Sequence, residues 1–166
     1  MNLAIDTDAL IKLTKSSSKA AIGKAFGVLV PPEVQRECVE QGKAGGFPDA
    51  LRVEENIEKG LLTVRRPKRS ARTEAMVEDL RLSGGEADVL RLHRSGGIDL
   101  IVSDDRRFLQ ILEALGIRYT APGPLIAAMF RLGMMPRTEA LGRLEKLGAF
   151  ISEEEHSEAE RAIEEE

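Results

Sequence analysis

The sequence predicts an α/β protein in which helices cover both faces of a central, mostly parallel sheet of about five strands. Short apolar segments alternate with helical patterns along the chain, as they do in βαβ units. Proline and glycine stand where several of these helices would begin or end. The chain has 166 residues, a length typical of one domain that buries its own core.

The elements follow from these signals in chain order. The apolar segment 1–6 predicts a strand that stops at Asp6, and "GVLV" (27–30) predicts a second, buried strand. "PPEVQRECVEQG" places proline in the first turn of a helix that Gly42 should end, and Gly60 should close the next amphipathic helix. Ser83 should cap the helix of "SGGEADVLRLHRSGG". In full, we expect strands at 1–6, 27–30, 61–66, 98–103 and 117–121. We expect helices at 9–15, 31–42, 48–60, 83–97 and 106–116. A further helix should follow the basic loop 65–72 and end at residue 82, and the chain after the last strand should be helical.

Composition excludes several classes of protein. Cys38 is the single cysteine, which rules out a disulfide framework and a thiolate zinc cluster. The two histidines, His93 and His156, are too few and too far apart for a histidine-based zinc site. The N-terminus lacks a secretory signal pattern, and no apolar run has the length of a membrane span. We therefore expect a soluble, cytoplasmic protein that does not bind membranes.

The net charge of −4 conceals an uneven distribution. Residues 153–166 carry eight glutamates against one arginine, while the rest of the chain has 23 basic and 20 acidic side chains. We divide the chain into a main domain, residues 1–150, and an acidic C-terminal helix or tail, residues 151–166. The tail could compete with a polyanion for the basic loop, or it could serve only solubility.

Acidic side chains from four separate segments are predicted to meet at one edge of the sheet. Asp6 ends the first strand, and the adjacent Asp104 and Asp105 end the fourth. Glu86 opens a helix that runs antiparallel to that fourth strand, so it returns to the same edge. Glu37 lies about one and a half turns into its helix, ~9 Å from the edge. Ligand sites of parallel sheets lie at this carboxyl edge, and clustered oxygen ligands suit Mg²⁺ or Mn²⁺.

Each acidic residue also has a simpler interpretation. Asp6 and Asp104 could each cap the helix that follows, and Glu86 has the spacing of a capping box with Ser83. Glu37 could be a solvated helix residue. Taken together, four independent caps and surface acids need not meet at one edge, and this convergence favours a metal site.

Four segments resemble the PIN-domain family, which includes the VapC-type toxin ribonucleases and related archaeal proteins. They are "LAIDTDALIKL", "PPEVQREC", "GGEADVLRL" and "LIVSDDRRF", and the similarity runs from about Asn2 to Gly148. The resemblance implies a Rossmann-like three-layer α/β/α fold and cleavage of RNA at a Mg²⁺ or Mn²⁺ site. It also implies an antitoxin protein as a possible partner, and a homodimer.

The same resemblance assigns roles to single residues. In the acidic set of the family, Asp6 matches the acid that ends the first strand, Glu37 matches the acid on the helix that follows the proline pair, and Asp105 matches the fourth acid. Glu86 stands where toxin members more often have Asp, and Asp104 falls at a variable polar position. Ser103 would lie near a metal-associated water, and Asp8 could orient Asp6. The expected metal ligands are Asp6, Glu86, Asp104 and Asp105, and the catalytic set adds Glu37 and Ser103.

Basic residues outside this acidic set are the candidates for binding RNA phosphates. Aromatic residues are scarce, with one tyrosine and no tryptophan, which argues against broad single-strand binding by stacking. The basic loop could equally be a solvated surface loop, and the arginines after Asp105 could form structural ion pairs. The candidates are Arg65, Arg66, Lys68, Arg69 and Arg72 in the loop, with Arg106 and Arg107 beside the acids.

Two alternatives remain open. A haloacid-dehalogenase-like phosphatase would use Asp6 as a nucleophile and Asp8 as an acid, with the later acidic pair binding Mg²⁺. Against it, no segment clearly supplies the lysine motif of that family. The second alternative is a PIN-like domain that has lost catalysis and acts by binding a partner protein.

Overall fold

The computed structural model describes residues 1–165 and contains a five-stranded, all-parallel sheet in the order β3-β2-β1-β4-β5. The central strand β1 (Asn2–Ile5) pairs with β2 (Gly27–Val30) and β4 (Leu100–Val102). The outer strands are β3 (Thr63–Val64) and β5 (Tyr119–Thr120). Leu3, Ala4 and Ile5 of β1 are completely buried because the strand has a neighbour on each side and helices on each face. The predicted α/β class is confirmed.

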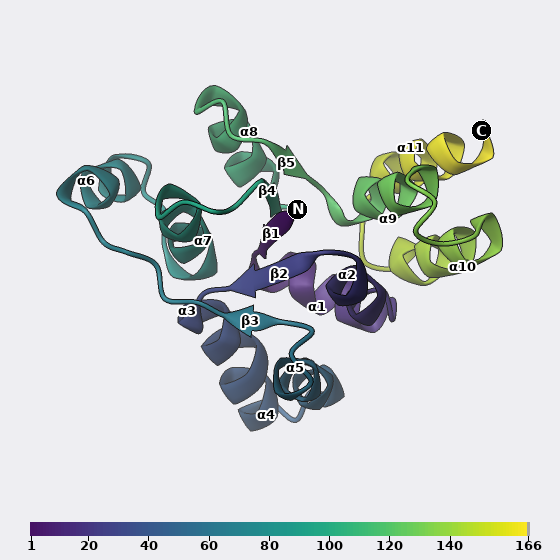
Figure 1. The fold of residues 1–166 in the computed structure, drawn as a ribbon, viewed down its shortest axis with the longest axis horizontal. Helices are drawn as coiled ribbons and strands as arrows, with labels where there is room; N and C mark the ends of the chain where they lie inside the picture. The colour runs from purple at the N-terminus through teal and green to yellow at the C-terminus, as the bar shows by residue number, and fades with distance from the viewer. Residues whose placement is uncertain (166) are drawn as a thin grey trace.

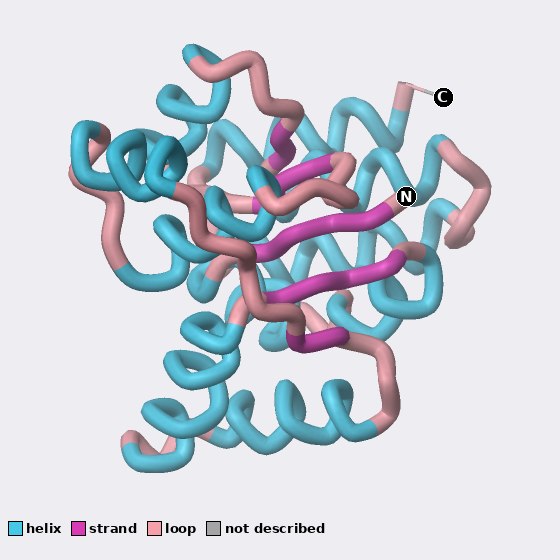
Figure 2. The backbone as a smooth tube through the Cα atoms, turned by 60° about the vertical axis from the view of Figure 1, so that its left-hand side comes forward, coloured by secondary structure: helices cyan, strands magenta, loops and turns pink. Residues whose placement is uncertain are grey.

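Helices cover both faces of this sheet, as Figure 1 shows. One layer holds α6 and α7, and α1, α2 and the C-terminal helices lie on the opposite side. Helices α3 to α5 extend past the edge strand β3 in Figures 1 and 2. The bounds are α1 (Thr7–Lys15), α2 (Lys19–Ala25), α3 (Pro32–Gln35), α4 (Gly42–Ala44), α5 (Pro48–Glu58), α6 (Ala71–Asp79), α7 (Gly84–Arg94), α8 (Arg106–Ala114), α9 (Pro122–Arg131), α10 (Arg137–Gly148) and α11 (Glu153–Glu164).

The helix after β2 departs from the prediction at two points. It does not end at Gly42, because α4 continues to Ala44 with Gly42 in a right-handed helical conformation. The missing side chain of Gly42 is used for packing instead, since a Cβ there would lie 2.8 Å from the Cβ of Ala50 on α5. Between α3 and α4 the helix widens into a π-helical segment, η1 (Arg36–Gln41), which contains Glu37. Such segments are rare and often occur at functional sites.

The edge strands are shorter than predicted. Two residues of the predicted 61–66 segment form β3, and two of the predicted 117–121 segment form β5. Each of these strands has one neighbour, so the ladder ends where the pairing with β2 or β4 ends.

The acidic C-terminal segment is a helix that packs on the rest of the fold. Helix α11 contacts α9 and α10, and its Ala159 and Ile163 belong to the hydrophobic core. The Glu155 side chain accepts a hydrogen bond from the backbone N–H of Gly123 at 2.8 Å. Glu166, the last residue of the predicted acidic segment, lies outside the described residues. A domain boundary at residue 150 stays a prediction.

Within residues 1–165, no helix combines the length and the apolar character needed to cross a membrane.

Candidate active site

A cavity of about 610 Å³ opens at the carboxyl edge of the sheet, beside the ends of β1 and β4. Strands β2 and β3 lie on one side of β1, whereas β4 and β5 lie on its other side. The order of the strands therefore reverses between β1 and β4, at this cavity. Such switch points are the usual ligand sites of open parallel sheets. The acidic side chains that line the cavity are Asp6, Asp8, Glu37, Asp49, Glu86 and Asp105.

Asp6 is buried at the base of this cavity, with 3% of its surface exposed. Its carboxylate caps α1 by accepting a hydrogen bond from the Ala9 N–H at 3.0 Å. Loss of solvation raises the pKa of Asp6 to about 6, against the lowering effect of hydrogen bonds from Ser103 and Ala9. The capping interpretation of Asp6 is therefore correct, and it does not compete with a role in the cavity, because a carboxylate has two oxygens.

Ser103 links the acids at the ends of the two central strands. Its side chain is completely buried, and its hydroxyl hydrogen-bonds to Asp6. The same hydroxyl accepts a hydrogen bond from the backbone N–H of Asp105 at 3.2 Å. Ser103 thereby holds Asp6 and the start of α8 in a fixed relation, which makes it a positioning residue.

The adjacent acids Asp104 and Asp105 point to different partners. Asp105 caps α8 by accepting from the Phe108 N–H at 2.7 Å, and it lines the cavity. Asp104 forms an ion pair with Lys12 of α1 and does not line the cavity. Of the two residues predicted as ligands, the structure brings only Asp105 to the other acids. The sequence suggested Asp104 as the cap of this helix, whereas in the structure the cap is Asp105.

Glu37 reaches the cavity from η1 and lies against the start of α7. The Thr7 hydroxyl donates a hydrogen bond to it. A Cβ added to Gly84 would lie 2.8 Å from Glu37 Oε1, and a Cβ added to Gly85 would lie 3.0 Å from Oε2. The glycine pair therefore allows this carboxylate to approach the helix terminus, where the helix dipole favours negative charge.

Glu86 is half-buried in the first turn of α7 and shares the cavity with the other acids. Its pKa is raised, first by burial and then by the negative charge of Asp105, while Arg107 acts in the opposite direction. Ser83 is the N-cap of α7 but its side chain makes no capping hydrogen bond. The predicted capping box is thus incomplete, and the cavity is the better account of Glu86.

The predicted basic residues do not gather at the cavity. Arg65 donates to the carbonyl of Gly96 at 2.8 Å, and the backbone N–H of Lys68 donates to Ser95 at 2.6 Å, so this loop lies near the C-terminus of α7. Gly84 and Ser95 are ~16 Å apart along the helix, which separates the loop from Glu86. Arg69 is 3.7 Å from Glu74, and Arg66 and Arg72 are exposed.

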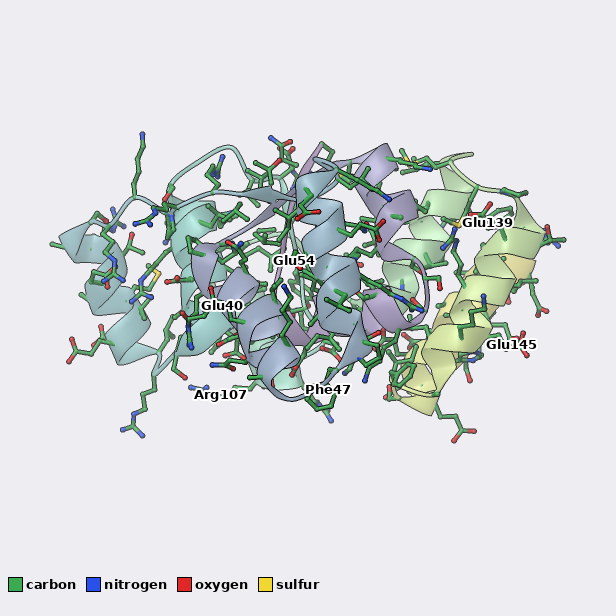
Figure 3. The ribbon with its side chains drawn as sticks, turned by 90° about the horizontal axis from the view of Figure 1, so that it is seen from below. Glu40, Phe47, Glu54, Arg107, Glu139 and Glu145 are labelled. Atoms are coloured by element: carbon green, nitrogen blue, oxygen red, sulfur yellow. The ribbon has the colours of Figure 1, made fainter. Side chains whose placement is uncertain are left out.

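The arginines that follow Asp105 are both exposed. Arg107 donates to the Leu80 carbonyl at 2.6 Å, and no ion pair with an acid is formed by its guanidinium in the described structure. Figure 3 shows Arg107 and Phe47 on the same side of the molecule, at its lower edge in that view.

The chemistry of the cavity fits a divalent cation. Its donors are carboxylates, which are the ligands that Mg²⁺ and Mn²⁺ prefer, and Lys15 is the one lysine or arginine lining it among the described residues. Burial raises the pKa of Asp6 and of Glu86, and neighbouring negative charges raise both further; a cation in the cavity would oppose these effects. As the side chains stand, however, no three His, Cys, Asp or Glu residues within 1–165 form a ligand group. One oxygen of Asp6 and one of Asp105 already accept capping bonds, so the acids would turn their free oxygens towards the ion.

The sequence did not single out four residues that position the acids in and next to this site. Thr7 holds Glu37, Lys12 holds Asp104, and Gly84 and Gly85 make room for Glu37. The sequence placed the two glycines at the start of a helix. Gly84 has a φ of +55°, a conformation that glycine adopts more readily than other residues. The partners of Thr7 and Lys12 are 30 and 92 residues away, so only the folded chain reveals them.

A family model described as a PIN domain matches residues 2–165, which is nearly the whole chain and includes α11. No curated protein and no solved structure matches the chain.

Proposed function

The chain belongs to the PIN-domain family, and from this premise we propose that it is an endoribonuclease that requires Mg²⁺ or Mn²⁺. PIN domains are in general nucleases, so family membership assigns a nuclease-type function acting on nucleic acid. The choice of RNA and of these two ions belongs to the proposal. A role as the toxin of a toxin-antitoxin pair, with an antitoxin protein as partner, is a further part of it.

One observation carries the proposal: Asp6, Glu37, Glu86 and Asp105 come from four segments and line one cavity at the switch point of the sheet. Asp6, Glu86 and Asp105 are the proposed metal ligands. A divalent cation bound there would supply positive charge and Lewis acidity to the scissile phosphate.

The remaining groups orient these ligands. Ser103 fixes Asp6 relative to Asp105, and Thr7 fixes Glu37, whose carboxylate can accept a proton from a water molecule in the cavity. Asp104 does not line the cavity and is paired with Lys12. Its part in the proposal is to hold the loop that carries Asp105.

The test is cleavage of a single-stranded RNA, with a DNA strand of the same sequence as comparison. We expect internal cuts in RNA with Mg²⁺ or Mn²⁺, and none after addition of EDTA. Asp105→Asn should abolish cleavage and weaken Mn²⁺ binding in calorimetry, whereas Asp79→Asn, on the exposed end of α6, should change neither. Cleavage by Asp105→Asn at the wild-type rate would remove the cavity from the reaction.

A second substrate separates the phosphatase alternative. That enzyme would form a phosphoaspartate on Asp6 and hydrolyse para-nitrophenyl phosphate. Turnover of this ester without cleavage of RNA would overturn the proposed function. If neither substrate is hydrolysed and Mn²⁺ does not bind, the domain acts through partner binding instead.

A further inference from the structure

The cavity is larger than a metal ion and a phosphate require, and its outer part has a different character from the acidic end. Its volume of about 610 Å³ is in the range of pockets that hold a small molecule. The wall away from the strand ends includes Ile11, Ala50 and Phe47, with Gln41, Asp49 and Lys15 as polar groups. Apolar surface beside a few polar groups is the usual composition of a site for an organic ligand.

Phe47 is the conspicuous residue of this wall, because 63% of its surface is exposed although it lines the cavity. Packing of the core does not account for a phenyl ring in that position. In Figure 3 the Phe47 side chain lies at the lower edge of the molecule, beyond the ribbon of α4 and α5.

The backbone holds this ring in a defined place. The Phe47 N–H donates to the Gly42 carbonyl at 2.9 Å, which closes the end of α4, and Pro48 begins α5 directly afterwards. Gly46 has a φ of +73°, a conformation that suits glycine at such a helix end. A Cβ at Gly45 would lie 2.6 Å from the ring, so one part of the ring rests on bare backbone. A ring fixed in this way pays little entropy when a planar ligand stacks on its free face.

We propose that Phe47 stacks on a nucleobase of the RNA substrate, in a nucleotide subsite of the cavity next to the acidic site. This inference rests on the proposed function and names the part of the substrate that the outer wall recognises. A base is planar and apolar on its faces, which suits Phe47, and polar on its edge, which suits Gln41 and Asp49 of the same wall.

Lys15 completes the subsite as its cation. Its ammonium lies 4.9 Å from the centre of the Phe150 ring, which holds it at the cavity wall. A phosphate joined to the stacked nucleotide would lie near this positive charge. At the other end of the cavity, the acids would repel a phosphate unless a metal ion were bound between them. A single aromatic ring stacks on one base, which agrees with the scarcity of aromatic residues in the chain.

The chain offers a direct spectroscopic test because it contains no tryptophan. Phe47→Trp places a single indole in the subsite. Leu51→Trp is the matched control, since Leu51 is 60% exposed one helical turn further along and does not line the cavity. Both variants are titrated with adenosine 5′-monophosphate and with ribose 5-phosphate, in the presence of Mg²⁺.

We expect saturable quenching of the indole by the nucleotide in Phe47→Trp, none by the sugar phosphate, and none by either compound in Leu51→Trp. Equal responses of the two variants, or equal responses to the two compounds, would overturn the subsite. Quenching specific to Phe47→Trp without any cleavage of RNA by the wild type would keep the subsite and reject the nuclease function.

Kinetics give an independent test with the wild-type cavity. Phe47→Ala should raise KM for single-stranded RNA about tenfold, within the range for loss of one stacked base, while kcat stays within about twofold. Phe47→Trp should retain the wild-type KM and Phe47→Leu should not, because stacking needs an aromatic face. If Phe47→Ala and Leu51→Ala both change the oligomeric state and leave KM unchanged, the exposed pair is a protein interface and the proposal is wrong.

Discussion

The Lys12 ammonium of α1 forms an ion pair with the Asp104 carboxylate in the loop between β4 and α8. This pair separates the functions of two adjacent acids. Asp104 joins the loop to α1, with 9% of its side chain exposed, and Asp105 is left to cap α8 and face the cavity. The repulsion between neighbouring carboxylates is reduced because each has its own partner.

Lys12→Met should therefore destabilise the protein and reduce cleavage indirectly. The mostly buried Asp104 would lose its counter-charge, at a cost of about 1–2 kcal/mol in the free energy of unfolding, since the pair is partly solvated. Chemical denaturation measures this loss, and Lys24→Met, an exposed lysine of α2, is the control. In the combined Lys12→Met, Asp104→Asn variant the two effects should not add. Additive effects would mean that the pair does not contribute.

Asp6→Asn should remove activity and raise stability. We expect RNA cleavage to fall by at least about a hundredfold, more than the loss of a residue that only supports a ligand. Asparagine keeps the cap on α1 but carries no buried charge. Because the Asp6 pKa is raised to about 6, the wild type carries the cost of a buried carboxylate above pH 6, and this cost vanishes as the pH falls towards 4.

Without metal, Asp6→Asn should thus be about 1–3 kcal/mol more stable than the wild type at pH 7.5 and nearly equal to it at pH 4. Thermal melts followed by circular dichroism give the comparison. A variant that is less stable at both pH values would contradict the conclusion that burial of the charged Asp6 carboxylate destabilises the wild type.

Gly85→Ala tests the space around Glu37. The added Cβ would lie 2.6 Å from Thr7 Oγ1 and 3.0 Å from Glu37 Oε2, so Glu37 or α7 must move. We expect a loss of about 1–3 kcal/mol in stability and a clear fall in the cleavage rate. Gly142→Ala is the matched control in α10, where the new Cβ would meet open space as far as residues 1–165 show. Stability there should stay the same or rise by about 0.5–1 kcal/mol, since alanine favours helices.

Lys19→Met tests a buried amine outside the cavity. The Lys19 side chain is buried, its Nζ has no hydrogen-bond partner within the described residues, and desolvation lowers its pKa to about 8. The unfolded chain then binds more protons between pH 8 and pH 10.5, so the stability of the wild type rises across that window.

At pH 7 the full cost of the buried charge is present, and Lys19→Met should stabilise the protein by about 1–2 kcal/mol after allowance for screening. The gain should disappear near pH 10.5. Urea unfolding at the two pH values decides this, and a gain that does not depend on pH would point to packing rather than charge.

Ile163→Ala tests whether the acidic helix is part of the folded core. Ile163 is completely buried in α11, so its truncation should cost about 2–5 kcal/mol in the free energy of unfolding. Glu164→Ala, on the exposed side of the same helix, should be close to neutral. If Ile163→Ala melted like the wild type, the C-terminal segment would be a free arm able to compete with RNA for the basic loop.

The sequence by itself determined the class of fold and the edge at which the acids meet. Alternation of apolar and amphipathic segments defines βαβ units, and parallel strands present their ends at one edge whatever the details of packing. Asp6, Glu37, Glu86 and the pair Asp104 and Asp105 were predicted to meet at this edge, and all of them except Asp104 line the cavity. Helix ends marked by Gly60 and Ser83 were also predicted, because these residues act locally.

Tertiary structure decided the contacts between distant segments. It directs Asp104 to Lys12 and Asp105 to the cavity, keeps the basic loop at the far end of α7, and turns Gly42 from a helix end into a packing position. It also packs α11 on α9, where an acidic, low-complexity sequence gave little sign of burial. These outcomes depend on which side chain meets which across the fold, and no local propensity encodes that choice.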